Sequence, residues 1–473
     1  MLPLYRFLAL LVGSLSWGAA HAAGLDDPYV GGMFGSPAAT NPTAAWWNPA
    51  GLAAARGTRF LLDVGPSFSN LTIDRSGLER GGAETFTDTA AVPFVGLASD
   101  FGVRRVGVGF ALFVPQAQRW QSNADEGPNR YALRSTDLRV LQVSLAGAYQ
   151  FRKVLSIGVS ASILDSRQRW TYDEPLVEEL AVDAPAGTFD DGQITDPAYA
   201  ATTRLELEDQ AATFGVGLYL RPWGDPRFAV AVAYNHGARF DNDGLLRLDV
   251  ACPPETDPVG RAIAQDQGLC DASVEGLGTV RLRLPARVHA GVKVRPVRAV
   301  RLEAFGTWVR WSELSEVRIG TTVTPDAIDS EQADVVASRL TRERPQARDL
   351  VDSFSATLDA KIAVSDEFTM GVRAGWESAA VPTAALSAAN ADTSTVRIAG
   401  MGLFRPFRAL EVGIAYGRDL ARTREVTLSA FGRSIVPDRA PRYRYVESRG
   451  RYSFVAQRVG LVVKGTLGPR GAR

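Results

Sequence analysis

The sequence predicts an all-β protein, a transmembrane antiparallel β-barrel of about 14 strands with an N-terminal hatch segment in its lumen. Three features support this fold class. Apolar and small residues alternate with a period of two along much of the chain. The alternating segments reach the ~9–11 residues of a tilted membrane-spanning strand. Short turns and long polar loops also alternate along the chain, as they do in outer-membrane barrels.

Residues 1–22 are expected to be a cleaved signal peptide. Arg6 supplies the positive charge, "FLALLVGSLSWGAA" supplies the apolar region, and Ala20-His21-Ala22 supplies small residues before the cleavage site. A membrane anchor is the alternative, but the apolar run is shorter than the ~20 residues that a spanning helix needs. The mature chain is therefore expected to begin near Ala23.

Residues 23–57 form a second unit, which we expect to act as a hatch, or plug. This segment is apolar, rich in Gly and Pro, and does not alternate as a strand would. A barrel of this size leaves a lumen that its own side chains cannot fill. Trp46 and Trp47 are therefore expected to pack inside the barrel, against an inner wall of Gly and Ala.

Residues 58–473 form the predicted barrel. In "LSIGVSASI", Leu155, Ile157 and Val159 share one face, whereas the other face carries only Ser and Gly. A soluble sandwich would bury the large residues and solvate the other face with residues such as Lys, Glu and Thr. The small residues found here favour a barrel whose large residues face lipid and whose small residues face the lumen.

An even number of strands is expected, because the chain then enters and leaves the barrel on the periplasmic side. The expected starts are residues 58, 91, 105, 136, 154, 211, 227, 279, 298, 353, 367, 394, 408 and 450. Aromatic residues near segment ends are expected to form an interfacial girdle. These residues are Trp120, Trp170, Trp223, Trp308, Trp311 and Trp376.

Composition and motifs exclude several classes of function. Lys plus Arg (52) equals Asp plus Glu (52), which argues against a nucleic-acid partner. Cys252 and Cys270 are the only cysteines, and in an exported protein they predict one disulfide. His236 and His289 lie near no nucleophile motif, so no enzyme is expected. Metal-ligand spacing and phosphate-binding loops are absent from the sequence, so no metal or cofactor is expected.

Four stretches, in this order, resemble the FadL/TodX family of outer-membrane transporters for long-chain fatty acids and other hydrophobic compounds. They are "NPAGLA"; "RVGVGFALFVPQAQRW" with "LQVSLAGAYQFRKVLSIGVSASI"; "RLPARVHAGVKVRP" followed by "TWVRWSEL"; and "MGVRAGWESAAVP". The first stretch resembles the family's Asn-Pro-Ala hatch motif. The resemblance covers nearly the whole mature chain.

The resemblance implies passive uptake of a hydrophobic molecule. The substrate would be captured at the extracellular loops, pass a site beside the hatch and leave sideways between strands. On this basis the hatch motif is the tight turn formed by Asn48, Pro49, Ala50 and Gly51. The substrate pocket is expected to include Phe34, Trp46 and Trp47.

A sideways exit requires an interrupted hydrogen-bond ladder. Pro115 lies inside the third expected strand, and proline cannot donate a hydrogen bond to a ladder. We therefore expect a kink at Pro115 that opens the wall. The alternative is that Pro115 only marks the outer end of the strand.

The chain departs from the family pattern in two places. "SAANADTSTVRI" replaces the Pro-Asp pair that usually follows the "GW…P" segment. The chain ends in a basic tail, "RVGLVVKGTLGPRGAR", rather than in the aromatic residue that is commonly read during assembly. The expected protein is a monomer in the outer membrane. Its expected partners are membrane lipid, the outer-membrane assembly machinery and a hydrophobic substrate.

Other functions remain open at this point. An aromatic-hydrocarbon channel needs the same apolar volume as a fatty-acid transporter. A general porin carries rings of charge around an open lumen, whereas the charges here are scattered, as at Glu303, Arg373 and Glu411. A purely structural barrel would not need the apolar N-terminal segment.

Three cations are candidates for binding a substrate carboxylate. Lys293 is expected in the lumen, and Arg130 and Arg134 are expected in the second long loop. The alternative for each of them is an ordinary solvated charge.

Overall fold

The computed structural model describes residues 32–78, 81–91, 93–124, 127–175, 196–429 and 448–467. The expected signal peptide, residues 1–22, and the first part of the expected hatch, residues 23–31, lie outside the described residues. Within these ranges, no helix is both long and apolar enough to span a membrane.

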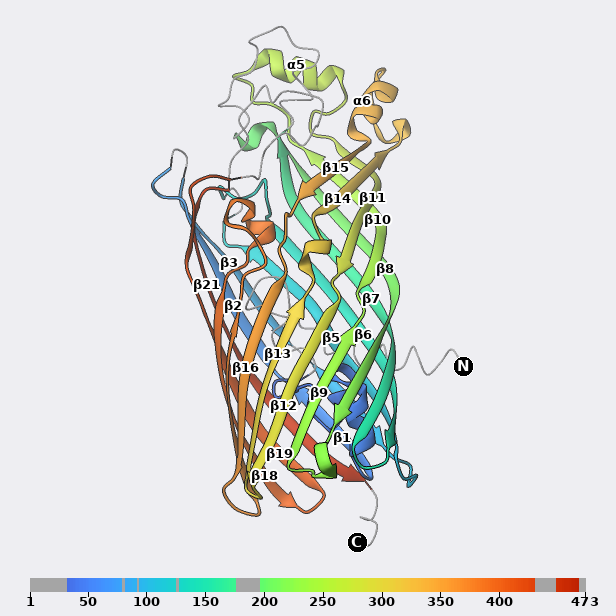
Figure 1. The fold of residues 1–473 in the computed structure, drawn as a ribbon. Helices are drawn as coiled ribbons and strands as arrows, with labels where there is room; N and C mark the ends of the chain where they lie inside the picture. Colours follow the sequence, from blue (N-terminus) through green and yellow to red (C-terminus); the bar gives the residue numbers. More distant parts are fainter. Residues whose placement is uncertain are drawn as a thin grey trace.

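The chain forms a closed antiparallel β-barrel of 14 strands, which confirms the predicted fold class (Figure 1). The first segment, β1 (Thr58–Val64), pairs with β4 (Phe94–Ser99) on one side and with β21 (Gly450–Leu467) on the other. This pairing of the first strand with the last closes the barrel. A closed barrel gives each strand two neighbours, so its backbone groups can be satisfied within hydrocarbon.

Half of the strands are interrupted, so the 14 strands comprise 21 β-segments. The uninterrupted strands are β5 (Val106–Ser122), β6 (Ser135–Phe151), β7 (Leu155–Pro175), β8 (Ala200–Leu220), β17 (Phe368–Glu377), β18 (Thr395–Phe407) and β21. The interrupted strands are β1 with β2 (Pro66–Asp74), β3 (Ala83–Ala91) with β4, β9 (Phe228–Asn235) with β10 (Ala238–Val250), β11 (Ser273–Leu284) with β12 (Arg287–Val297), β13 (Val300–Val309) with β14 (Glu316–Val323), β15 (Arg342–Ala347) with β16 (Ser353–Ala363), and β19 (Leu410–Ala421) with β20 (Arg424–Val426).

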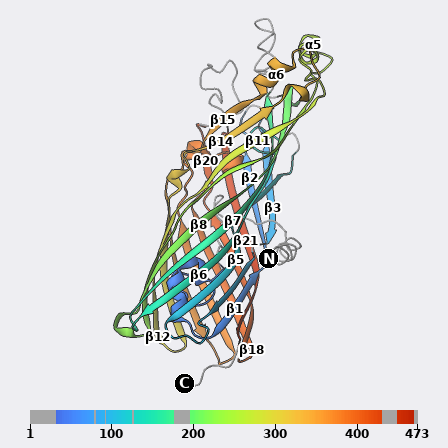
Figure 2. The same cartoon turned by 90° about the vertical axis from the view of Figure 1, so that its right-hand side faces the viewer.

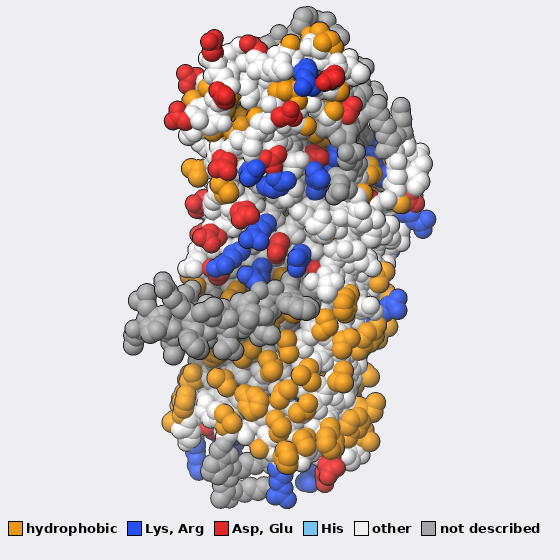
Figure 3. Space-filling view, turned by 180° about the vertical axis from the view of Figure 1, so that it is seen from behind, with side chains coloured by type: hydrophobic (Ala, Val, Ile, Leu, Met, Phe, Trp, Pro, Cys, Tyr) orange, Lys and Arg blue, Asp and Glu red, His pale blue; other side chains and the backbone are white. Residues whose placement is uncertain are grey.

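The type of residue on each face changes along the strands. In the half of β8 nearest the short turns, Phe214 is exposed on the outer face and Gly217 is buried on the inner face. In the other half, Leu205 is buried inside and Arg204 is exposed. Figure 3 shows the result on one face of the molecule, an apolar belt with Lys, Arg, Asp and Glu above it. We call the half with the belt the lower barrel and the half nearest the long loops the upper barrel.

Four of the expected strand starts are wrong. The strands begin at Ala83 (β3) rather than at residue 91, at Ala200 (β8) rather than at 211, at Ser273 (β11) rather than at 279, and at Arg342 (β15) rather than at 353. All four errors lie in the upper barrel, where charged residues face outward and the sequence therefore resembles a polar loop. The break between β11 and β12 falls at Pro285 and Ala286, because proline cannot donate to the ladder.

The expected girdle of tryptophans is only partly present. Trp223 and Trp376 are exposed. Trp120 and Trp311, in contrast, are nearly fully buried in an apolar cluster inside the upper barrel. A shift of one residue along a strand moves a side chain to the opposite face, so position near a strand end does not decide the face.

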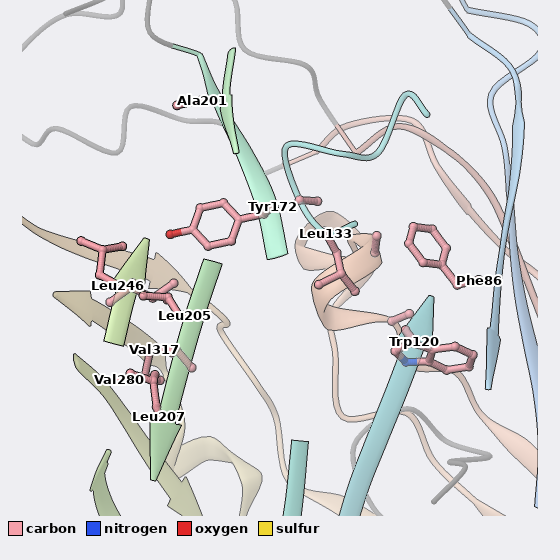
Figure 4. Close-up of a cluster of buried hydrophobic side chains, with 14 of the residues drawn as sticks. Phe86, Trp120, Leu133, Tyr172, Ala201, Leu205, Leu207, Leu246, Val280 and Val317 are labelled. Atoms are coloured by element: carbon pink, nitrogen blue, oxygen red, sulfur yellow. The ribbon is translucent and has the colours of Figure 1, made fainter. Parts of the chain in front are cut away.

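Apolar side chains form a buried cluster inside the upper barrel (Figure 4). The cluster brings together residues from distant strands, including Phe86 on β3, Trp120 on β5, Leu205 on β8 and Val280 on β11. Leu133, from the loop between β5 and β6, lies beside Trp120 and Phe86. The inner face of the upper barrel is therefore apolar, although its outer face is charged.

The long loops carry most of the helical elements. α5 (Pro258–Asp266) and α6 (Ala333–Leu340) lie beyond the strands at the upper end (Figures 1 and 2). Cys252 and Cys270 form a disulfide that closes the loop containing α5, so these sulfurs are not available to a metal ion. The short 3₁₀ helices of the loops and turns are η2 (Pro197–Tyr199), η3 (Pro222–Gly224), η4 (Trp311–Glu313), η5 (Pro325–Ala327), η6 (Thr383–Ala385) and η7 (Ala388–Asn390).

Candidate functional site

The described part of the N-terminal segment, residues 32–57, lies inside the lower barrel (Figure 2). It contains α2 (Ala44–Trp47) and η1 (Pro49–Ala54). η1 contacts β5, β6, β7 and β8, and α2 contacts β5 and β6. The segment is therefore surrounded by barrel wall.

Asn48 joins the two short helices and binds the segment to the wall. Its Oδ1 accepts a hydrogen bond from Ala50 N–H at 3.1 Å, which caps η1. Its Nδ2 donates to the carbonyl oxygen of Leu218 on β8 at 2.9 Å. Pro49 occupies the first position of η1, where no helical hydrogen-bond donor is needed. One fully buried side chain thus forms the turn and its attachment to β8.

Glycines of the wall allow η1 to approach β5, β7 and β8 closely. A Cβ atom at Gly107, Gly158 or Gly217 would lie within 3.0 Å of the segment. The obstructing atoms belong to the Leu52 carbonyl, the Ala50 backbone and the Asn48 side chain, respectively. The small-residue inner face predicted from the sequence therefore leaves room for the backbone of the segment.

Trp46 and Trp47 lie at the centre of an aromatic cluster. The ring centroid of Trp46 lies 5.2 Å from that of Phe113 on β5. The ring of Trp47 lies 5.0 Å from His289 on β12 and 5.6 Å from Phe305 on β13. His289 is itself bonded through Nδ1 to the Thr307 hydroxyl at 2.9 Å and contacts the Asn235 amide through Nε2. His289 thus packs against the tryptophans as part of the wall.

Cationic side chains of the wall bind the backbone of the same segment. Arg373 donates from Nη1 to the Met33 carbonyl and from Nη2 to the Gly35 carbonyl, both at 2.8 Å. Lys293 Nζ donates to the Ala38 carbonyl at 2.9 Å. Lys293 is also buried, so its interpretation as a solvated charge is wrong.

Two carboxylates of the wall accept hydrogen bonds from the segment. Glu303 accepts from the Ser36 hydroxyl, and Asp63 accepts from Met33 N–H at 2.8 Å. Glu303 was expected among the lumen charges, whereas Asp63 was not predicted. The signal that could have found it is a carboxylate on the face of "RFLLDV" opposite Phe60, Leu62 and Val64. Glu411 pairs instead with Arg405 of the wall.

The segment borders two cavities. The larger lies beside Trp46 and reaches Pro115 on β5. Its other lining residues include Ser144, Ser160, Ser162, Leu164, Asn235, Leu284 and Arg287. The smaller cavity lies beside Phe34 and is also lined by Leu61 and Met401. Trp47 lines neither cavity.

The wall is interrupted near Pro115. β5 continues from Val106 to Ser122, so the interpretation of Pro115 as the outer end of the strand is wrong. The register between β5 and β6 shifts between Phe113 and Gln116, which is a bulge at the proline.

The opposite edge of β5 is interrupted at the same level. β4 pairs with β5 up to Phe94 and Phe113, and pairing with β3 resumes only at Thr87 and Gln121. Among the described residues between these pairs, no ladder pair joins the two strands. The Asp88 side chain accepts instead from Arg119 N–H at 3.2 Å.

The two loop arginines are bonded within the upper barrel. Arg130 and Arg134 both form ion pairs with Asp173 of β7, at 3.4 Å and 3.1 Å. Arg134 also donates to the Thr202 hydroxyl on β8 at 3.1 Å. Arg130 is buried, so its interpretation as a solvated charge is wrong.

Comparison with known proteins identifies relatives of the whole chain. Residues 22–391 match the family described as outer membrane protein transport protein (OMPP1/FadL/TodX). No curated protein sequence matches the chain. A solved Pseudomonas aeruginosa FadL homologue is similar at 15% identity and a TM-score of 0.71, covering 96% of this chain and 99% of that one.

Two further solved structures are similar. The Pseudomonas putida toluene transporter TodX matches at 13% identity and a TM-score of 0.64, covering 91% of this chain and 95% of that one. The CymD monoaromatic hydrocarbon channel matches at 13% identity and a TM-score of 0.62, covering 95% of this chain and 100% of that one. At these identities the likeness is one of fold.

Proposed function

This chain belongs to the outer membrane protein transport protein family (OMPP1/FadL/TodX), and on that premise we propose that it takes up long-chain fatty acids or similar hydrophobic molecules. In this proposal uptake is passive, the N-terminal segment is the hatch, and the substrate leaves sideways through the wall. A hydrophobic molecule crosses the polar surface of the outer leaflet poorly. An apolar path through a protein lowers that barrier.

The apolar inner face of the upper barrel carries the proposal. Phe86, Leu205 and Val280 point inward at a level where the outer face is charged, which is the reverse of the lower barrel. A water-filled pore for polar solutes has no use for such a lining, whereas a hydrophobic substrate gains from leaving water there. The upper barrel thus provides a place for apolar capture.

The contacts of the N-terminal segment support its role as the hatch. It is bonded to β8 through Asn48, to β12 through Lys293 and to β17 through Arg373. These attachments come from several sides of the barrel. They argue against a general porin, because lumen charges that would line an open pore instead bind the segment.

The interrupted ladder at Pro115 supports sideways exit. The cavity beside Trp46 reaches Pro115, and the ladder on the β3–β4 side of β5 is broken at that level. A substrate that moves from the hatch along this cavity would meet the least hydrogen-bonded part of this edge. We propose that it leaves the barrel there.

The lining of the larger cavity favours substrates with a polar head. Arg287 and the hydroxyls of Ser144 and Ser160 line it beside the ring of Trp46. A carboxylate could accept further hydrogen bonds from such groups, whereas a pure hydrocarbon can form none with them. We therefore propose fatty acids rather than aromatic hydrocarbons as the substrates. Two of the similar structures nevertheless belong to a toluene transporter and a monoaromatic hydrocarbon channel.

The test is uptake of three labelled compounds by cells that express the chain in the outer membrane. The proposal predicts uptake of oleate above that of cells with an empty vector. Uptake of toluene alone would move the substrate to aromatic hydrocarbons. Entry of small sugars without either hydrophobic compound would indicate a porin. The proposal also includes a monomer delivered by the outer-membrane assembly machinery, which cross-linking of intact cells would test.

A further inference from the structure

The barrel wall contains a second interruption, between β8 and the strand formed by β9 and β10. β9 pairs with β8 from Leu220–Val230 to Gly215–Asn235, and β10 pairs with β8 from Glu208–Asp243 onward. All residues between these pairs are described, and no ladder pair joins them. β8 remains paired with β7 throughout, and β10 remains paired with β11. On the β11–β12 side only the two positions between Asn235 and Ala238 lack ladder pairs, so the wider break is the one toward β8.

A few individual hydrogen bonds replace the ladder across this break. His236 N–H donates to the Phe214 carbonyl at 2.8 Å. The Thr213 hydroxyl contacts the carbonyl of His236 at 2.7 Å and that of Gly237 at 3.2 Å. Further up, Asp241 N–H donates to the Asp209 side chain. Parting these strands would disrupt these few bonds rather than a continuous ladder.

Two neighbouring strands leave the ladder at the same level. Asn235 pairs with Arg287 and Ala238 with Leu284, so the two positions between these pairs on each strand lack ladder pairs without a change of register. Against β8, in contrast, seven residues (236–242) face six (209–214), and this extra residue on the β9–β10 side is a bulge. A bulge redirects a wall and weakens its local pairing.

The larger cavity reaches this second interruption. Its lining includes Thr213 and Gly215 on β8 and Asn235 on β9. The same cavity is lined by Pro115 and Trp46. One cavity therefore reaches both of these interruptions of the wall, beside the N-terminal segment.

The outer side of the interruption faces the upper border of the apolar belt. Phe214 is half exposed there, and its ring stacks on His236 with centroids 4.8 Å apart. The Tyr234 hydroxyl is bonded to His236 Nδ1 at 2.9 Å. Aromatic side chains with a polar partner are typical of the boundary between lipid tails and headgroups.

We propose that the edge between β8 and β9–β10 is a second lateral opening, which serves amphipathic molecules that carry a hydrogen-bonding head. This inference rests on the proposed uptake function and adds a route to it. The head would lie among Ser160, Asn235 and Arg287 of the cavity. The apolar tail would pass Phe214 into the lipid. Molecules in the cavity would then have two exits, one at Pro115 and one at Thr213.

The test is a covalent staple across the second interruption. In Phe214→Cys/His236→Cys the new thiols replace two stacked rings. The native cysteines are already bonded to each other, so free thiols report only the new pair. The matched control is Phe214→Ala/His236→Ala, which loses the same rings without a staple. Labelled oleate uptake is compared at equal amounts of folded barrel.

We expect the stapled protein to take up oleate more slowly than the alanine control. Addition of Pro115→Val to the stapled protein should reduce uptake further than either change alone. Equal rates in the stapled and alanine proteins, with staple formation verified, would overturn the second opening. If the wild-type chain takes up no oleate at all, the proposed function fails instead.

A second measurement is needed in case the Phe214→Cys/His236→Cys variant does not fold or does not form its disulfide. Thr213→Cys places one thiol on the cavity side of the interruption. A bulky lipid-soluble maleimide should label this thiol in membranes and slow oleate uptake. Labelling without any loss of uptake, or no labelling in a folded barrel, would contradict the opening. The same reagent on Ile398→Cys, which is exposed on β18, provides the control.

Discussion

The guanidinium of Arg458 donates to Oδ1 of Asp63 at 2.8 Å, and the two side chains are 0% and 4% exposed. The other oxygen of this carboxylate, Oδ2, accepts from Met33 N–H. Asp63 belongs to β1 and Arg458 to β21, so the pair spans the closure of the barrel. One carboxylate therefore connects the first strand, the last strand and the N-terminal segment.

Asp63→Asn should destabilise the barrel, because it removes the buried negative charge that pairs with Arg458. Breaking a buried pair in this way typically costs about 3–5 kcal/mol. Unfolding by guanidinium chloride in detergent measures the loss. Arg167→Gln is the control, since its ion pair with Asp165 is largely exposed, and it should change the midpoint little. Equal midpoints for the two variants would contradict the structural role of Asp63.

Gly158→Val should displace the hatch without preventing barrel formation. A side chain at Gly158 would overlap the Ala50 backbone, whereas a Cβ at Gly147 would meet nothing within 4 Å. We expect leakage of a small polar dye through Gly158→Val barrels in liposomes. Gly147→Val should remain as tight as the wild type. Equal leakage in both variants would argue against a hatch held by close packing on β7.

Deletion of residues 30–52 is a more drastic form of the same experiment. The deletion removes Asn48, Trp46 and the carbonyls that Arg373 and Lys293 bind. Dye flux through the folded barrel should then exceed that of Gly158→Val. Unchanged flux would mean that the segment does not close the lumen.

Pro115→Val should lower oleate uptake while leaving the yield of folded barrel unchanged. Valine restores an N–H donor at the bulge of β5 and favours continuous pairing with its neighbours. Pro325→Val, in a loop helix away from the wall, is the control. If Pro115→Val transports as well as the control does, exit at Pro115 is wrong.

The loop between β17 and β18 should be held more firmly at acidic pH. Burial raises the pKa of Asp392 from 3.8 to about 7, although its oxygens accept from the backbone of Ala380, Val381 and Thr393. A raised pKa in the folded state means that protonation favours folding. The contribution is therefore complete below pH 3.8 and is lost as the pH rises through about 7.

Hydrogen exchange at Ala380 and Val381 measures this pH dependence. Protection, corrected for the intrinsic rate, should fall as the pH rises toward neutrality. Asp392→Asn keeps an acceptor but cannot ionise, so its protection should not follow this trend. The same trend in Asp392→Asn would rule out Asp392 as the titrating group.

Much of the fold could be predicted from the sequence, because the alternation of lipid-facing and lumen-facing residues is a local pattern. A lipid-facing residue such as Val159 and a lumen-facing glycine such as Gly158 alternate wherever the wall crosses hydrocarbon. The upper half of β8 could not be recognised, because there Leu205 faces inward and Arg204 faces outward. Such a segment matches neither a spanning strand nor an ordinary loop.

In the site around the N-terminal segment, only the contacts that lie within a short sequence motif could be predicted. Asn48 caps its own turn two residues away, so the motif is visible in the sequence. Its attachment to Leu218 is 170 positions distant, and the pairing of Asp63 with Arg458 spans 395 positions. No local pattern marks such partners. The second interruption was missed for the same reason, since it depends on the register between separate strands.

The most direct test of the account is oleate uptake by cells that express the wild-type chain or the Asn48→Ala, Pro49→Ala variant at equal outer-membrane levels. The variant loses the cap on Ala50 and the bond to Leu218. If the segment gates transport, the wild type takes up oleate and the variant loses this uptake, with the barrel still folded. Equal uptake by the two proteins, or none by either, would contradict a hatch-gated transporter of fatty acids.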